Sequence, residues 1–245
     1  MSRYVSEIFI ELRRMVAGRL TVAVVVWLAV GLAVSAFVVW GFAEITEEVA
    51  EGESRRFDRA VLLWIESNVP SWMDGPMRAV TVLGDYLLVM PLLVVVSLVF
   101  FWRGWKLSAV MLCVSTAGGM LLTTVLKNAF RRARPEVIEV ADNTVNSFSY
   151  PSGHATLAVG FYGALALILA YRLSGFARWA VAVLGAFLIL LIGFSRLYLG
   201  VHYPTDVLAG FLAAPLWLVS VGGVYALWLS VRGLRAAEGR RKGVR

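Results

Sequence analysis

Thiols, imidazoles and charged side chains are all scarce in this chain of 245 residues. It contains one cysteine, Cys113, and two histidines, His154 and His202. A single cysteine cannot form an intrachain disulfide, and it excludes a metal site built from four thiolates. Only 16% of the residues are charged, whereas 60% are apolar, and the mean hydropathy is +0.77. This composition is unlike that of a soluble domain and predicts an integral membrane protein.

The apolar residues are gathered in six long runs. The first, over residues 20–42, contains no charged residue. As a helix it would be about 35 Å long, enough to cross a hydrocarbon layer of roughly 30 Å. The other runs cover residues 86–102, 107–126, 155–171, 179–194 and 207–231. We therefore predict an all-α fold: a polytopic membrane helix bundle with six transmembrane helices, forming a single domain over residues 1–245.

Polar segments lie before, between and after these runs. Residues 1–19 alternate arginines with apolar residues at helical spacing, which predicts an amphipathic segment on the membrane surface. Residues 43–83 are acidic at first and then amphipathic. They predict one or two interfacial helices on the outer side, with an ordered loop as the alternative. The basic tail 232–245 is expected to contact anionic lipid, and no nucleic acid partner is expected.

The basic residues also predict the orientation in the membrane. Of the 23 lysines and arginines, 14 fall on the side that carries both chain ends. By the positive-inside rule both termini are cytoplasmic, and the polar segments 128–153 and 195–206 face outward. The basic cluster over residues 127–134 opposes this bias. With six spans, three polar stretches, 127–135, 151–154 and 195–206, lie at this outer side and can meet. A span, a turn at 174–175 and a returning span separate His154 from Ser195, so the two return to the same level.

The pair His202 and Asp206 is the first candidate for chemistry. The two residues are four apart, so they share a helix face if the last span begins near His202. Pro204 fits this placement because proline is tolerated in the first turn of a helix. An aspartate there can accept Nδ1–H of the imidazole and leave Nε2 free as a nucleophile. A plain structural hydrogen bond is the alternative for such a pair taken alone.

A second group of residues predicts an anion site. Ser152 is a good N-cap directly before an apolar run, so Gly153 and His154 would lie at a positive helix end. Pro135 disfavours helix at the preceding residue and turns the chain there. The cations that could then converge are Lys127, Arg134 and Arg196. If these cations are considered without the histidines and the helix end, contact with lipid headgroups is the alternative interpretation.

Cations, a helix end and two imidazoles together predict phosphoryl transfer without a metal. Fixed cations can stabilise charge on the equatorial oxygens as magnesium does elsewhere. The acidic residues nearest in sequence, Glu136, Glu139 and Asp142, are scattered on a loop. We therefore expect neither a metal nor another cofactor.

These residues also resemble the three-part signature of the type 2 phosphatidic acid phosphatase superfamily. The matching stretches are Lys127-x6-Arg134-Pro135, Pro151-Ser152-Gly153-His154 and Ser195-Arg196-x5-His202-x3-Asp206. The signature region is thus 127–206. The resemblance implies that His202 forms a phosphohistidine, that Asp206 orients it, and that His154 protonates the leaving group. It also implies phosphate ligands, which we take as Lys127, Arg134, Ser152, Gly153, Arg196 and Ser195. Arg132 has a basic counterpart in many members of the family, and Arg131 has no assigned role.

The resemblance and the predicted spans lead to an expected function. We expect a lipid phosphatase of a bacterial cell membrane that acts on an amphiphilic phosphate at the outer leaflet, foremost undecaprenyl pyrophosphate. Phosphatidylglycerophosphate and phosphatidate are alternative substrates, because a phosphate site does not recognise the lipid tail. A lipid phosphotransferase and a non-catalytic lipid binder or transporter remain open. Vanadium haloperoxidases share the anion site, but they are soluble. The oligomeric state is not predicted.

Overall fold

The computed structural model describes residues 29, 31–136 and 147–217. The chain divides into two compact units after Trp40. In the first unit, residues 31–40 are helical, and the rings of Phe37 and Trp40 lie 6.1 Å apart. The second unit begins with helical residues 41–51 and contains the remaining described residues. The predicted segments 1–19 and 232–245 lie outside the described residues.

The second unit is built from helices, and its described part contains no β-strand. The helices are α2 (Arg55–Asn68), α3 (Asp74–Val82), α4 (Tyr86–Trp102), α5 (Lys106–Phe130), α6 (Gly153–Leu157), α7 (Ala164–Arg172) and α8 (Gly175–Tyr198). A short 3₁₀ turn, Ser71–Met73, precedes α3, and a π-helical turn, Ala158–Gly163, joins α6 to α7 into one continuous helix. A last helix covers residues 204–217. The all-α fold class is therefore confirmed for the described residues.

Local sequence explains where several helices begin and end. Asp85 caps α4, since its Oδ1 accepts the backbone N–H of Leu87 at 2.8 Å. Ser152 caps α6 in the same way through Ala155 N, at 3.4 Å. Helix α5 ends at Phe130 because Arg131 adopts the left-handed conformation, with φ of 46°. The chain thus leaves the helix before Arg134, earlier than Pro135 alone predicted.

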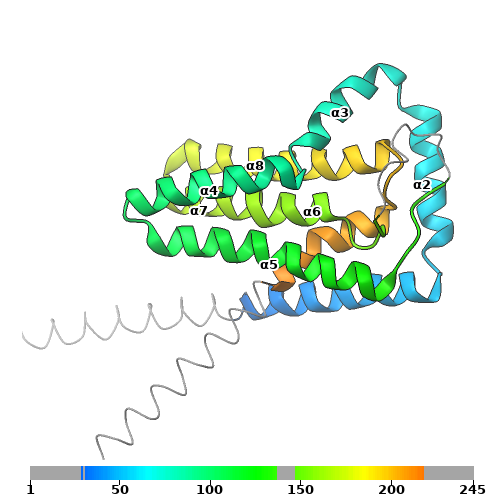
Figure 1. Cartoon of the computed structure of the whole chain (residues 1–245), viewed down its shortest axis with the longest axis horizontal. Coiled ribbons are helices and arrows are strands. Elements are labelled where there is room, and N and C mark those ends of the chain that lie inside the picture. Colours follow the sequence, from blue (N-terminus) through cyan, green and yellow to red (C-terminus); the bar gives the residue numbers. More distant parts are fainter. Residues whose placement is uncertain (1–28, 30, 137–146, 218–245) are drawn as a thin grey trace, which may run out of the picture. The chain divides into compact units, whose positions relative to one another are not determined.

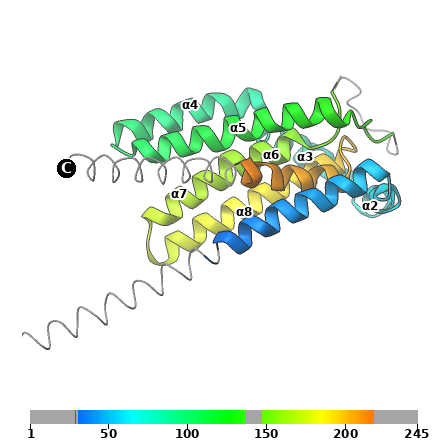
Figure 2. The same ribbon diagram turned by 90° about the horizontal axis from the view of Figure 1, so that it is seen from below.

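The long helices pack in pairs, α4 against α5 and α7 against α8 (Figures 1 and 2). Helix α2 crosses one end of these helices, and α3 lies at the same end (Figure 1). At the opposite end the turns after α4 and α7 meet, with the Arg172 guanidinium carbon 3.8 Å from the ring centre of Trp105. The returning hairpin predicted between His154 and Ser195 is confirmed, because Gly84 packs against both His154 and Ile192.

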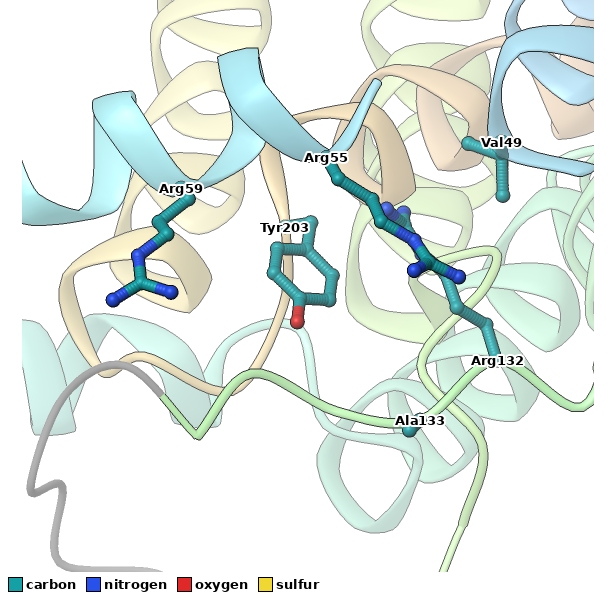
Figure 3. A pocket seen from close by; sticks show the side chains of 6 residues that line it. All are labelled: Val49, Arg55, Arg59, Arg132, Ala133 and Tyr203. Carbon is teal, nitrogen blue, oxygen red and sulfur yellow. The ribbon is translucent and has the colours of Figure 1, made fainter. Parts of the chain in front are cut away.

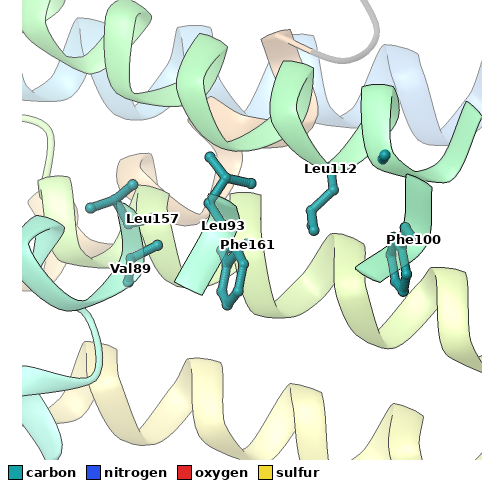
Figure 4. Packing of buried hydrophobic residues seen from close by; sticks show 7 residues of the cluster. Val89, Leu93, Phe100, Leu112, Leu157 and Phe161 are labelled. Carbon is teal, nitrogen blue, oxygen red and sulfur yellow. The ribbon is translucent and has the colours of Figure 1, made fainter. Parts of the chain in front are cut away.

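Side chains from α4, α5 and α6 to α7 form the main core. Val89, Leu93, Leu112, Leu157 and Phe161 are all buried there and point toward one another (Figure 4). This core fixes the relative positions of α4, α5 and α6, and therefore the start of α6, where His154 lies.

The outward faces of the long helices are apolar rather than charged. Leu190 and Phe187 of α8 are 62% and 59% exposed, and Leu121 of α5 is 57% exposed. Exposed apolar surface of this extent is unfavourable in water and indicates contact with lipid. The chain is a membrane protein.

The number of spans is confirmed only in part. Among the described residues, three helices are long and apolar enough to cross a membrane: Lys106–Phe130, Gly153–Arg172 and Gly175–Tyr198. A fourth span results if Ser71–Val82 and Tyr86–Trp102, bent by 44°, are one broken helix. The first and last predicted runs, 20–42 and 207–231, extend beyond the described residues. The count of six stays a prediction.

Residues 43–83 contain helices rather than an ordered loop alone. Helical residues 41–51, α2 and α3 occupy most of this segment. On α2 the buried residues are Asp58, Leu62 and Ile65, whereas Phe57 and Trp64 are exposed. The predicted interfacial position of these helices stays a prediction.

Candidate active site

Three segments far apart in sequence meet at the end of the bundle where α2 and α3 lie. They are the chain after α5, the turn before α6 and the turn after α8, which leads into helix 204–217. Backbone hydrogen bonds join them: Ser149 N donates to Arg132 O, and Ser152 N donates to Asp206 O, both at 2.9 Å. The predicted meeting of the three polar stretches is therefore confirmed.

His202 lies in the turn between α8 and the last helix, and only 2% of it is exposed. Its Nδ1 lies 3.4 Å from Oδ2 of Asp206, and its Nε2 lies 3.5 Å from Nη1 of Arg134. The last helix begins at Pro204, as the proline predicted. The aspartate therefore faces one ring nitrogen and a guanidinium faces the other.

The surroundings of His202 favour its neutral form. Burial lowers the pKa of this imidazole well below its usual value, and the nearby charges of Arg196, Arg134 and Lys127 lower it further. A neutral imidazole that donates Nδ1–H to the aspartate has an unprotonated Nε2, and only that form can attack phosphorus.

Two of the predicted cations are held by backbone carbonyls beside His202. Arg134 donates from Nε to Ser147 O at 2.8 Å and from Nη1 to Val201 O at 2.7 Å. The ammonium group of Lys127 donates to Phe148 O. These contacts hold both side chains against the segment 147–148, which precedes α6. Their positive charges therefore stay near His202.

The predicted helix start with Ser152 as its cap is present at α6, and anion binding there stays a prediction. Ser152 is fully buried, and Gly153 is the first helical residue behind this cap. The last helix approaches it closely at Gly210: a Cβ atom there would lie 2.6 Å from Ser152 O. Glycine is therefore needed at position 210 for the helix of Asp206 to reach the cap of α6.

His154 lies at the start of α6 and faces the bend between α3 and α4. Its Nε2 is 3.8 Å from Oδ2 of Asp85, which the sequence did not single out. Gly84 allows this approach, because a Cβ there would lie 3.2 Å from Cβ of His154 and 2.6 Å from Ile192. His154 is more exposed than His202, so it is the imidazole that a substrate oxygen can reach more easily.

Arg196 and Ser195 are both buried near the end of α8. Nη1 of Arg196 donates to Oγ1 of Thr81 on α3 at 2.6 Å. The hydroxyl of Ser195 donates to Ile192 O in its own helix at 2.6 Å. The structure thus ties Arg196 to α3, while the hydroxyl of Ser195 is engaged within α8.

Sequence reasoning missed a buried cluster behind Asp206. Arg132 donates from Nη1 to Oδ1 of Asp206 and from Nη2 to Oδ2 of Asp58, each at 2.6 Å. Thr205 also donates to Asp58, from both its backbone N–H and its hydroxyl. A signal for Asp58 was present in the spacing, since it shares the apolar face of α2 with Leu62 and Ile65.

A pocket of about 350 Å³ opens beside this cluster (Figure 3). Its lining consists of Val49, Arg55, Arg59, Arg132, Ala133 and Tyr203. The ring of Tyr203 is 4.3 Å from the guanidinium carbon of Arg132. None of the predicted phosphate ligands lines this pocket, so it adjoins the candidate site but does not contain it.

No three histidine, cysteine or acidic side chains converge as a metal site in the described ranges 31–136 and 147–217. The cluster that does form consists of cations, imidazoles and one helix end. Such an arrangement has the chemistry that phosphoryl transfer requires: positive charge for a tetrahedral anion beside an imidazole nitrogen.

Comparisons with known proteins agree with this class of site. Residues 108–230 match the family model described as the PAP2 superfamily, and the chain belongs to that superfamily. The chain is 33% identical to phosphatidylglycerophosphatase B of Bacillus subtilis over 144 residues, which is 57% of this chain and 69% of the relative. It is 30% identical to an undecaprenyl-diphosphatase of Sulfolobus acidocaldarius over 122 residues, 48% of this chain and 55% of that protein.

A solved structure is similar as well. The crystal structure of a transmembrane PAP2-type phosphatidylglycerolphosphate phosphatase from Bacillus subtilis matches with a TM-score of 0.69 and 27% identity. The match covers 78% of this chain and 96% of the other. The protein is therefore a membrane phosphatase, a hydrolase that acts on lipid phosphates.

Proposed function

We propose that this phosphatase works through a covalent phosphohistidine at His202. Nε2 attacks phosphorus and forms the P–N bond while the bond from phosphorus to the leaving oxygen breaks. His154, in its protonated form, gives the leaving oxygen a proton. Water then attacks phosphorus with His154 as the base, the P–N bond breaks, and inorganic phosphate leaves. One observation carries this proposal: Asp206 faces Nδ1 of His202, while Nε2 on the other side of the ring faces the Arg134 guanidinium.

Charge stabilisation in this mechanism comes from the protein. Lys127, Arg134 and Arg196 would hold the equatorial oxygens together with the cap of α6 at Ser152 and Gly153. All three cations act on the pKa of His202, which supports their convergence around its imidazole. The mechanism needs no metal ion, so excess EDTA should leave the rate unchanged.

The proposed substrate is a polyprenyl diphosphate such as undecaprenyl pyrophosphate, presented at the outer leaflet, with both termini of the chain in the cytoplasm. The undecaprenyl-diphosphatase relative supports this choice. Phosphatidylglycerophosphate is the second candidate, since the relative from Bacillus subtilis is named for it. The phosphate site alone does not distinguish them.

Phosphate release by the purified full-length protein in detergent, with excess EDTA, tests this function. Undecaprenyl pyrophosphate, phosphatidylglycerophosphate and phosphatidate are compared at equal concentrations, with His202→Ala as the control. Metal-independent release that disappears in the variant is expected, with the highest kcat/KM on the diphosphate. A strict need for a divalent cation would contradict the mechanism, and a preference for phosphatidylglycerophosphate would replace the proposed substrate.

A further inference from the structure

Asp58 is the one acidic residue on the buried face of α2. Its side chain has no exposed surface, whereas Glu66 on the same helix is exposed. A buried carboxylate is costly unless charged or polar groups compensate it. Here it accepts hydrogen bonds from Arg132 and from both donors of Thr205, at distances from 2.6 to 3.1 Å. The amphipathic helix thus contributes a fully compensated carboxylate to the interior.

Arg132 connects this carboxylate to the candidate site. One end of its planar guanidinium binds Asp58 and the other end binds Asp206, both at 2.6 Å. The face of the group stacks on the ring of Tyr203. Because the guanidinium is rigid, a carboxylate that fixes one nitrogen also fixes the direction of the other. The orientation of Arg132 toward Asp206 therefore depends on Asp58, together with the hydroxyl of Thr205, which accepts from Nη1 of Arg132 at 2.8 Å.

Asp206 divides its two oxygens between two directions. Oδ1 accepts from Arg132, while Oδ2 accepts the backbone N–H of Tyr203 at 2.8 Å and faces Nδ1 of His202. From this geometry we propose that Asp58 is a positioning residue for His202, acting through Arg132 and Asp206. The inference rests on the proposed function, in which His202 is the nucleophile.

The negative charge of Asp58 also affects how strongly Arg132 neutralises Asp206. Two carboxylates share one guanidinium, so Arg132 does not fully neutralise Asp206. A phosphorylated imidazole that keeps its Nδ1 proton carries a positive charge on the ring, and the remaining negative charge of Asp206 stabilises it. Without Asp58, Arg132 would pair with Asp206 alone and weaken that stabilisation. Loss of Asp58 should therefore slow the formation of the phosphoenzyme rather than weaken the binding of phosphate.

The variant Asp58→Asn tests this in the full-length protein. Asparagine keeps the shape and can still accept from Thr205, but it removes the negative charge that pairs with Arg132. We expect kcat to fall about 10- to 100-fold, the size of loss found when a group that orients a metal-binding side chain is removed. KM should change less than about twofold, because the phosphate ligands remain. Glu66→Gln, the same change at an exposed site of α2, should leave both constants unchanged.

A purely structural role for Asp58 makes different predictions, and the double variant separates them. If Asp58 acts through Asp206, then Asp58→Asn with Asp206→Asn should be no slower than Asp206→Asn alone. Effects that multiply in the double variant would overturn the proposal, as would full kcat in Asp58→Asn. Wild-type turnover by His202→Ala would instead contradict the proposed function.

Thr205→Val decides the matter if Asp58→Asn does not fold. This nearly isosteric change removes the hydroxyl that donates to Asp58 and accepts from Nη1 of Arg132, both at 2.8 Å, and it leaves every charge in place. Asp58 and the Arg132 guanidinium lose part of their restraint. We expect kcat to fall severalfold with KM unchanged, and an unchanged kcat would refute the positioning role. NMR of ¹⁵N-labelled histidine should also show a smaller fraction of the Nδ1–H tautomer at His202 in either variant.

Discussion

Nε2 of His202 lies 3.5 Å from Nη1 of Arg134. A guanidinium has no acceptor atom, so only an unprotonated Nε2 is compatible with this neighbour. The cation therefore selects the tautomer in which Nδ1 carries the proton, and Asp206 selects the same tautomer from the other side of the ring. In the proposed mechanism, Arg134 then binds an oxygen of the phosphate that Nε2 attacks.

The first prediction concerns the titration of His202. Burial and the surrounding cations lower its pKa, so the imidazole should stay neutral as the pH falls below its usual value of about 6.5. In the unfolded chain the same group gains a proton there. Below pH 6.5 the unfolded chain therefore binds more protons than the folded protein. The contribution of His202 to the free energy of unfolding declines as the pH falls below this value.

NMR of ¹⁵N-histidine-labelled protein checks this directly, because the chain has two histidines and His154→Asn leaves one. Added inorganic phosphate should raise the pKa, since its negative charge beside Nε2 opposes that of the cations. A ligand-free His202 that titrates at or above pH 6.5 would contradict the electrostatic account.

The second prediction concerns Gly84. In Gly84→Ala the new Cβ would lie 2.6 Å from Cγ2 of Ile192, which must shift, and 3.2 Å from His154, which must give by a few tenths of an ångström. Displacement of an acid by about 1 Å can cost up to about 100-fold in rate, so we expect this smaller shift to lower kcat severalfold. Gly75→Ala on α3 is the control, because nothing lies within 4 Å of its Cβ. Equal kcat values for the two variants would show that His154 tolerates the displacement.

The third prediction concerns Thr81. Its hydroxyl accepts from Arg196 at 2.6 Å, and Thr81→Val removes the acceptor without changing the volume. If this bond holds Arg196 toward the phosphate, KM should rise severalfold while kcat changes less. Thr124→Val serves as the control, since Thr124 is exposed and donates only to Met120 of its own helix. Identical KM values in the two variants would exclude a role for Thr81 in positioning Arg196.

Much of the fold followed from sequence because lipid imposes long apolar helices. The predicted run 86–102 has the same bounds as α4, and the runs for α5, α6 to α7 and α8 each lie inside a longer helix. The helices extend into polar sequence: Gly153 and Arg196 are helical although neither is in an apolar run. Hydropathy alone does not reveal such extensions.

The site was predicted where its residues are close in sequence or lie at the predicted outer ends of neighbouring spans. His202 and Asp206 are four apart, and one turn brings them together. Asp58 and Thr205 are separated by 147 positions, and no local pattern pairs them. Asp58 could have been noticed as an acid on an apolar helix face, but its partner becomes visible only when α2 crosses the end of the bundle.

Covalent labelling of His202 tests the central claim most directly. Purified protein is mixed with a lipid diphosphate carrying ³²P at the terminal phosphate and is quenched within milliseconds in alkali or in acid. We predict a transient label on the wild-type protein that survives alkali and is lost in acid, as a phosphohistidine is. In His202→Ala the label should be absent and phosphate release should fall by about 1,000-fold or more. An equal label on His202→Ala, or phosphate release at the wild-type rate, would show that His202 is not the nucleophile.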